Sequence, residues 1–160
     1  MNARNIAALA VTASLLAFAA QDARAADGPL AQFAGNWSGS GKITTDNGTS
    51  ERIRCRSNNT ASGNALALNL RCASDSYKFE LSSDISYDGG NISGSWNENT
   101  RGVFGKLSGK ANGNNIQATA SAVGFTASLS IRSGGGAQNV LMKSPGSEIS
   151  EVSISMARGK

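Results

Sequence analysis

The sequence predicts an all-β protein: an antiparallel up-and-down β-barrel of about eight to ten strands with one disulfide. Apolar and polar residues alternate in short runs, and Gly, Asn and Pro turn signals separate these runs. No helical periodicity follows residue 25, apart from a single turn at residues 30–33. Because the connections are short hairpins, a meander is the simplest topology, and closing it into a barrel removes the exposed edges of a long sheet.

The alternation is clearest over residues 77–87, where aromatic and aliphatic side chains share one face and Lys, Glu, Asp and Ser share the other. The charged face could not lie against lipid without cost, so the apolar face is the interior and the barrel is not membrane-spanning. Turn signals divide the chain into ten predicted strands, at residues 36–45, 50–57, 65–73, 77–87, 92–98, 102–111, 115–121, 125–131, 138–143 and 148–157.

The two cysteines, Cys55 and Cys72, are predicted to form a disulfide across one hairpin. A two-residue turn at Gly63-Asn64 places them directly opposite each other. They fall on a non-hydrogen-bonded pair, where Cα atoms are roughly 4.5 Å apart. A disulfide can bridge that separation.

Two further turns are predicted from their residues. One hairpin is expected to turn at Asn112-Gly113, which would place Leu107 opposite Ala118. Residues 144–147 match a type II turn, because Pro and Gly occupy its two central positions.

The N-terminus indicates export. Arg4 precedes an uncharged apolar run at residues 6–20, and residues 23–25 offer a small-x-small cleavage pattern, so residues 1–25 are interpreted as a secretory signal peptide. Residues 26–34 form an N-terminal segment, and residues 35–160 form a single barrel domain. Together with the disulfide, this predicts a periplasmic or secreted protein, with a Gram-negative periplasm expected.

Composition disfavours several functions. The formal charge of +4 falls short of the concentrated basic stripe of a nucleic-acid-binding protein. The chain has no histidine, which removes the usual general base, the usual haem ligand and most zinc and copper sites. No metal site or cofactor is therefore expected, and a nitrobindin-like haem barrel is disfavoured. With both cysteines paired and no nucleophile elbow, we expect no catalytic residue and no enzymatic activity.

The first predicted strand opens on Gly35-Asn36-Trp37, which resembles the G-x-W signature of the calycins, the lipocalin, fatty-acid-binding and avidin group. In that group a basic residue of the last strand packs over the Trp at the closed end of the barrel. Arg158 is the matching residue here, since it shares a face of the last strand with Ile154 and can place its guanidinium over the indole. The resemblance implies that Gly35, Trp37 and Arg158 are structural; other lipocalin signatures are not evident.

Small residues occupy many predicted inward positions. They are Gly39, Gly41, Gly94, Gly105, Gly109, Ala118, Ala120 and Ala127. They would either leave an apolar pocket for a lipid-like ligand or let the strands coil tightly around filling aromatics. The ligand-binding candidates are Tyr77, Phe79, Tyr87, Trp96 and Phe125, and the polar tips of Tyr and Trp suit a barrel mouth.

A cluster of arginines is predicted on the other face of the disulfide-bonded hairpin. It consists of Arg52, Arg54, Arg56 and Arg71. Like charges directly opposite, as at Arg56 and Arg71, destabilise a hairpin. The cluster would bind an anionic partner, such as phosphate-bearing lipid A, an acidic polysaccharide or a protein, or else be a solvated face neutralised by Glu51, Asp75 or Glu80.

Two functions follow from these features. The first is a non-enzymatic periplasmic barrel that binds a small hydrophobic or lipid-like molecule. The alternative is an envelope module that binds protein or polymer, such as a periplasmic protease inhibitor, because small exported metalloprotease inhibitors are also barrels with a G-x-W-like start and one disulfide.

Overall fold

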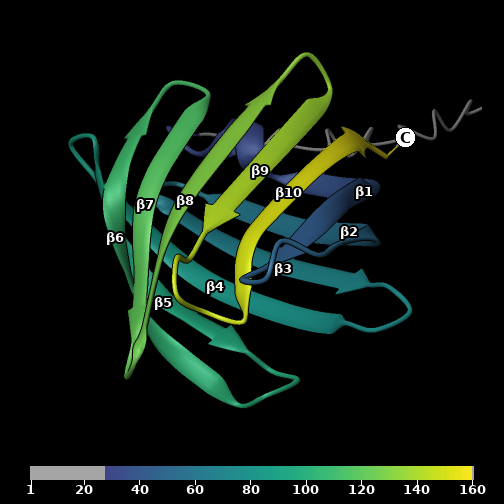
Figure 1. Ribbon diagram of the computed structural model, residues 1–160. Coiled ribbons are helices and arrows are strands. Elements are labelled where there is room, and N and C mark those ends of the chain that lie inside the picture. The colour runs from purple at the N-terminus through teal and green to yellow at the C-terminus, as the bar shows by residue number, and fades with distance from the viewer. Residues whose placement is uncertain (1–27, 160) are drawn as a thin grey trace, which may run out of the picture.

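The chain folds into one closed β-barrel, in a computed structural model that describes residues 28–159. The predicted signal peptide at residues 1–25 lies outside the described residues. Ten antiparallel strands follow one another around the barrel, and the last pairs with the first (Figure 1), which confirms the predicted fold class. The strands are β1 Gly35–Thr45, β2 Ser50–Ser62, β3 Ala65–Ala73, β4 Lys78–Asp88, β5 Asn91–Glu98, β6 Val103–Asn112, β7 Asn115–Ala122, β8 Phe125–Gly134, β9 Ala137–Lys143 and β10 Ile149–Arg158.

Two strands are longer than the sequence predicted. β2 continues beyond residue 57 and β8 continues beyond residue 131. Their inward positions include Asn59 and Ser133, residue types that are typical of turns but are buried here. The Asn59 amide donates to the carbonyl of Phe33, and the Ser133 hydroxyl donates to the carbonyl of Gln32. These polar side chains therefore hold the extended strand ends against the segment that precedes β1, through its residues Gln32 and Phe33.

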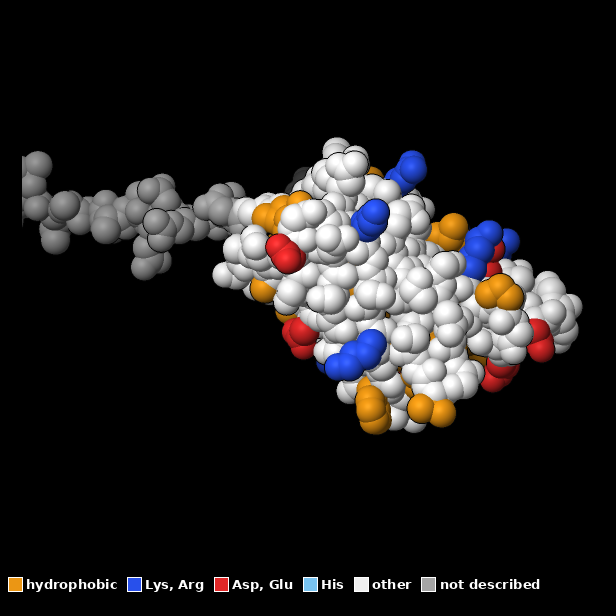
Figure 2. Space-filling model, turned by 90° about the vertical axis from the view of Figure 1, so that its left-hand side faces the viewer, with side chains coloured by type: hydrophobic (Ala, Val, Ile, Leu, Met, Phe, Trp, Pro, Cys, Tyr) orange, Lys and Arg blue, Asp and Glu red, His pale blue; other side chains and the backbone are white. Residues whose placement is uncertain are grey.

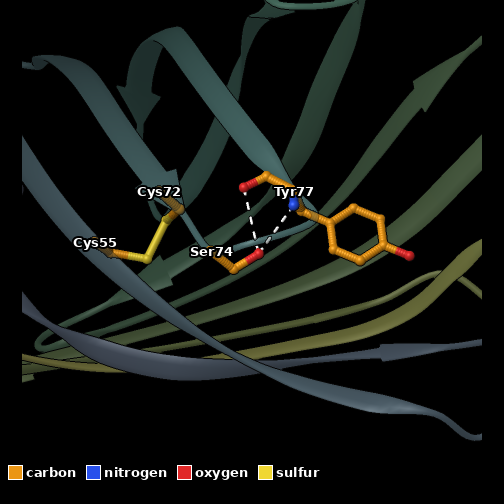
Figure 3. Close-up of a disulfide and its surroundings, with 4 residues drawn as sticks. All are labelled: Cys55, Cys72, Ser74 and Tyr77. Atoms are coloured by element: carbon orange, nitrogen blue, oxygen red, sulfur yellow. Dashed lines mark hydrogen bonds between the residues drawn. A yellow bond between two sulfur atoms is a disulfide. The ribbon is translucent and has the colours of Figure 1, made fainter.

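The disulfide hairpin has the predicted register. Cys55 pairs with Cys72 between β2 and β3 and is joined to it by a disulfide (Figure 3). Both side chains are buried in the barrel interior. A covalent bond therefore fixes β2 to β3 from the inside.

The predicted register of β6 and β7 is wrong by two residues. Leu107 pairs with Ala120, not with Ala118. The turn is formed by Gly113 and Asn114, because Gly113 takes a positive φ of 54° while no other residue type in the described chain has a positive φ. Glycine at the first turn position is typical of a type II′ hairpin, whereas an Asn-Gly turn needs positive φ at both positions.

One end of the barrel is closed by a 3-10 turn, Ala31–Phe33. Leu30 and Phe33 are completely buried, and Trp37 is 2% exposed. The Trp37 indole nitrogen donates to the carbonyl of Phe33 over 3.2 Å. The Arg158 guanidinium lies 4.2 Å from the centre of the Trp37 ring and donates to two backbone carbonyls of the entering segment. These residues form what we call the closed end.

The opposite end, called here the open end, carries the connections β1–β2, β3–β4, β5–β6, β7–β8 and β9–β10. The predicted type II turn lies here: the N–H of Ser147 donates to the carbonyl of Ser144, and Gly146 has φ of 82°. Residues 28–159 contain no helix long and apolar enough to cross a membrane.

Candidate functional site

The barrel interior is not sealed throughout. Ile53, Leu66 and Ile116 are buried inward-facing side chains of the core. Other inward-facing apolar side chains are only half-buried, namely Leu70 and Leu81 on the β3–β4 wall and Leu129 and Val152 on the β8–β10 wall. The inward apolar face is therefore less completely buried at these four positions than in the packed core.

Two predicted ligand residues form a stacked pair at the open end. The rings of Tyr77 and Phe79 are nearly parallel, at 4°, with centroids 6.2 Å apart. The backbone before them is held by Ser74, whose hydroxyl accepts the N–H of Tyr77 over 2.9 Å (Figure 3). Both rings are half-buried. Aromatic surface is therefore accessible where the interior meets solvent.

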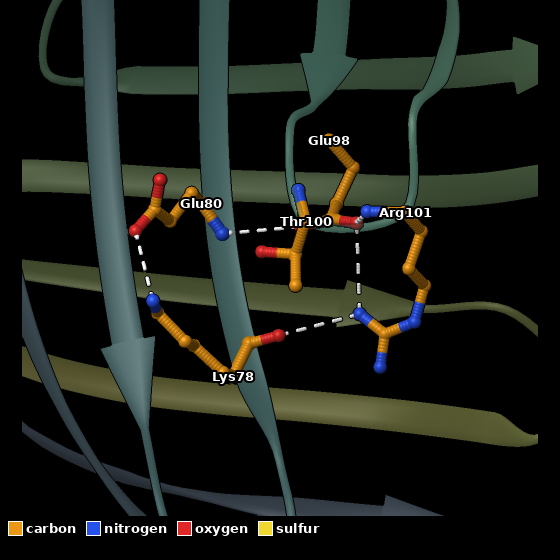
Figure 4. Close-up of polar contacts among 5 residues, drawn as sticks. All are labelled: Lys78, Glu80, Glu98, Thr100 and Arg101. Carbon is orange, nitrogen blue, oxygen red and sulfur yellow. Dashed lines mark hydrogen bonds and ion pairs between the residues drawn. The ribbon is translucent and has the colours of Figure 1, made fainter.

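Arg101, which was not a predicted site residue, lies over the Phe79 ring of this pair. Its guanidinium carbon is 4.9 Å from the centre of the Phe79 ring, and its Nη1 lies 3.6 Å from Glu98 Oε2 and 3.3 Å from the carbonyl of Lys78 (Figure 4). The ion pair has a signal in the sequence, because Arg101 follows Glu98 by three residues. The contact with Phe79 depends on a strand from a different hairpin.

Glu98 organises the same end of the barrel from a buried position, with 7% of its surface exposed. Its carboxylate accepts the backbone N–H groups of Glu80, Thr100 and Arg101 (Figure 4). Burial raises the pKa of Glu98, but these hydrogen bonds outweigh it and bring the pKa below its ordinary value. The side chain is therefore an ionised brace between β4 and the β5–β6 connection, without the raised pKa of a general acid.

A second aromatic pair lies at the open end. Trp96 and Phe125 have ring centroids 5.6 Å apart and are tilted by 57°. The Trp96 indole nitrogen donates to the carbonyl of Lys106 over 3.1 Å. The polar group of Trp96 is thus satisfied by the barrel itself, and the two rings offer an apolar surface.

Tyr87 does not join the other predicted ligand residues. It shares the inward face of β4 with Tyr77 and Phe79, but it pairs with Ile92 beside the turn to β5, at the closed end. Ten residues of extended strand span roughly 33 Å. Tyr77 and Tyr87 therefore lie at opposite ends of the barrel, because a shared face does not mean a shared end.

The inward glycines bring neighbouring strands together. A Cβ added at Gly94 would lie 1.9 Å from the carbonyl oxygen of Asp84, and one at Gly105 would lie 1.9 Å from that of Ser121. Gly39, Gly41 and Gly109 are equally tight, at 2.0 to 2.1 Å. These glycines therefore serve strand coiling.

The four predicted arginines lie exposed on the outer face of β2 and β3. Arg56 is directly opposite Arg71, as predicted. Within residues 28–159 none of the four takes part in an ion pair. Glu80, one of the carboxylates considered as a neutralising partner, lies directly opposite Arg71 but is paired with Lys78 at 3.4 Å. Their charge is therefore left to solvent or to a partner.

No group of three or more metal-binding side chains occurs in the part of the chain that the structure describes. No protein-family model matches the chain, and no curated protein matches its sequence. The barrel is similar to the crystal structure of Rv2717c from M. tuberculosis, with a TM-score of 0.63 and 12% sequence identity over 82% of this chain and 95% of that chain. At this identity the likeness concerns the fold alone.

Proposed function

We propose that this protein is a non-enzymatic, exported barrel that holds a small apolar molecule in its interior. The observation that carries the proposal is the set of half-buried, inward-facing apolar side chains, represented by Leu70, Leu81 and Leu129. Such side chains lose water when a ligand enters, and each buried CH₂ contributes about 0.8 kcal/mol. The buried disulfide supports export, since disulfides persist in oxidising compartments.

The ligand enters through the open end. Leu30, Phe33 and Trp37 fill the closed end completely, whereas the stacked pair of Tyr77 and Phe79 at the open end is half-buried. The contact of Trp37 with Arg158 supports a calycin-like barrel, and barrels of the lipocalin type hold small ligands in this way.

The interior favours an uncharged ligand body. Its buried carboxylate, Glu98, already has three backbone donors and an arginine partner. A polar head group would instead remain at the open end, beside the Tyr77 hydroxyl and the Arg101 guanidinium. An amphiphile with a lipid-like tail fits this division.

The first test is native mass spectrometry of the protein purified from its own cells, in which a co-purifying lipid-sized mass is expected. The second test uses an apolar fluorescent probe, N-phenyl-1-naphthylamine, with delipidated protein. Leu129→Trp should place a larger side chain in the interior. Probe binding should weaken by roughly tenfold or more, because this side chain occupies the space that the probe needs.

Ser130→Trp is the matched control, because Ser130 is the next residue of β8 and faces outward. It should bind the probe as the unmodified protein does. A delipidated protein that fails to bind the probe, or equal binding by both tryptophan variants, would refute an interior ligand site.

A further inference from the structure

The outer face of β1–β4 concentrates positive charge. Six cations point outward there: Lys42, Arg52, Arg54, Arg56, Arg71 and Lys78. Three carboxylates, Glu80, Asp84 and Asp88, share the face, all of them on β4, and Glu80 is paired with Lys78. By contrast, the face over β6 and β7 shows few and scattered charges (Figure 2). The charge is therefore local to one side of the barrel.

The strand register places like charges next to each other. Arg56 lies opposite Arg71, and Lys42 lies opposite Arg52. Like charges directly opposite each destabilise a sheet by a few tenths of a kcal/mol or more. The Glu51 carboxylate accepts the N–H of Ser76 in the β3–β4 connection and makes no ion pair with these cations within residues 28–159. Repulsion between these cations lowers the stability of the folded protein, and a bound anion would reduce that repulsion.

Four of these cations, Arg54, Arg56, Arg71 and Lys78, line a groove of about 950 Å³. Its lining residues come from β1–β4, together with Asn99 and Gly159, and none comes from β6–β9. Since an interior cavity would also contact the opposite wall, the groove lies on the outside of the barrel. Its outward-facing side chains thus form a surface distinct from the interior, although Leu70, Phe79 and Leu81 belong to both linings.

Amide side chains accompany the cations in the groove. Asn36, Asn58 and Asn69 form one row across β1, β2 and β3, next to the row that contains Arg56 and Arg71. An amide offers both donors and an acceptor, which suits hydroxyl groups, while a guanidinium binds a carboxylate through two parallel hydrogen bonds. The outer side chains of the groove therefore match a ligand that carries hydroxyls and carboxylates.

Apolar recognition is lacking on this face of the described chain. The exposed large apolar side chains are Val103, Phe104, Val123 and Leu141, which belong to β6, the β7–β8 turn and β9. The lining of the groove includes Leu70, Phe79 and Leu81, but strand alternation turns their side chains to the interior. The outer side chains of the groove therefore offer no surface for an acyl chain and no platform for stacking a base.

We infer that this groove binds an acidic polysaccharide through its carboxylates and hydroxyls. Arg52, Arg54 and Arg56 follow at every second position of β2, about 7 Å apart, and present a line of guanidinium groups to an extended chain. The four strands add roughly 14 Å of width, enough for several sugar units. The inference is independent of the interior ligand.

The test measures binding of an oligogalacturonate by isothermal titration calorimetry. The triple variant Arg54→Ser, Arg56→Ser, Arg71→Ser should bind it roughly tenfold more weakly or worse, and the affinity of the unmodified protein should fall between about 50 mM and about 200 mM salt. Neutral dextran should not bind. Because all three side chains point outward and two of them repel each other, the variant should melt no lower than the unmodified protein. Arg71→Ser alone removes one of the three charges and should weaken binding less.

A matched control removes the same charge elsewhere on the barrel, as Lys106→Ser, Lys110→Ser and Arg132→Ser on the outer faces of β6 and β8. It should bind as the unmodified protein does, and so should Leu129→Trp. The inference is overturned if the unmodified protein does not bind the oligogalacturonate, if the control loses as much affinity as the groove variant, or if DNA or anionic vesicles bind as tightly through the same arginines.

Discussion

The two ends of this barrel are closed by different means. At the closed end, Phe33 and Trp37 are almost entirely buried, and Arg158 covers the indole. At the open end, Tyr77 and Phe79 are half-buried, and order comes from hydrogen bonds to a single carboxylate. One end therefore uses apolar burial for stability, and the other keeps apolar surface accessible while polar contacts hold its connections.

The largest expected effect is at the closed end. Trp37→Ala should lower the free energy of unfolding by about 3–5 kcal/mol, as expected for a large buried aromatic residue that leaves a cavity. Phe79→Ala at the open end should cost only about 1 kcal/mol, because part of the ring already contacts water. Urea denaturation followed by far-ultraviolet circular dichroism measures both. Equal losses in the two variants would contradict the contrast between the ends.

The disulfide should have the next largest effect. Replacing both Cys55 and Cys72 by alanine should cost about 3 kcal/mol, since the bond closes a loop with a sequence separation of 17 residues. Denaturation with and without reductant measures the loss. Reductant should destabilise the unmodified protein and leave the double variant unchanged; an unmodified protein that is insensitive to reductant would show that the bond contributes little.

The smallest effect is expected from the brace of the open end. Glu98→Gln should cost about 1–2 kcal/mol at pH 7, because an amide group replaces an acceptor of charged hydrogen bonds. The pKa of Glu98 is lowered in the folded protein, so its contribution is present above the unfolded pKa and is lost as pH falls through the folded value. The unmodified protein should therefore lose more stability than the variant between pH 7 and acid pH.

Glu148→Gln, in the exposed β9–β10 turn, serves as the control for this pH comparison. The pKa of Glu51 is also lowered by hydrogen bonds from Ser74 and Ser76, so Glu98→Gln should retain part of the acid-dependent loss. Parallel pH profiles for Glu98→Gln and the unmodified protein would show that the carboxylate is not a brace.

Local sequence was sufficient for most of the fold. The alternation of residues 77–87 and the turn at Gly63 and Asn64 predicted strand faces and the pairing of Cys55 with Cys72, because these depend on neighbours in the chain. The β6–β7 register failed at Gly113, where an Asn-Gly and a Gly-Asn turn compete within one three-residue stretch. Only the backbone conformation of the glycine decides between them.

The candidate site was less accessible to sequence reasoning. Its half-buried leucines alternate with polar residues as any core residue does. Their contact with solvent depends on the distance between opposite walls of the barrel, which the strand sequence does not show. Arg101 reaches Phe79 across a hairpin boundary, and the groove on β1–β4 depends on the registers of four strands. These properties arise only when distant segments meet.

The seam between β1 and β10 has a consequence for how the molecule is made. Arg158 contacts the carbonyl of Ala34, 124 residues earlier in the chain, whereas the other strand pairings are between consecutive strands. During synthesis from the N-terminus, the hairpins can assemble in turn, but β1 keeps an unpaired edge until β10 arrives. A chain interrupted before β10 would expose two such edges, which are templates for aggregation.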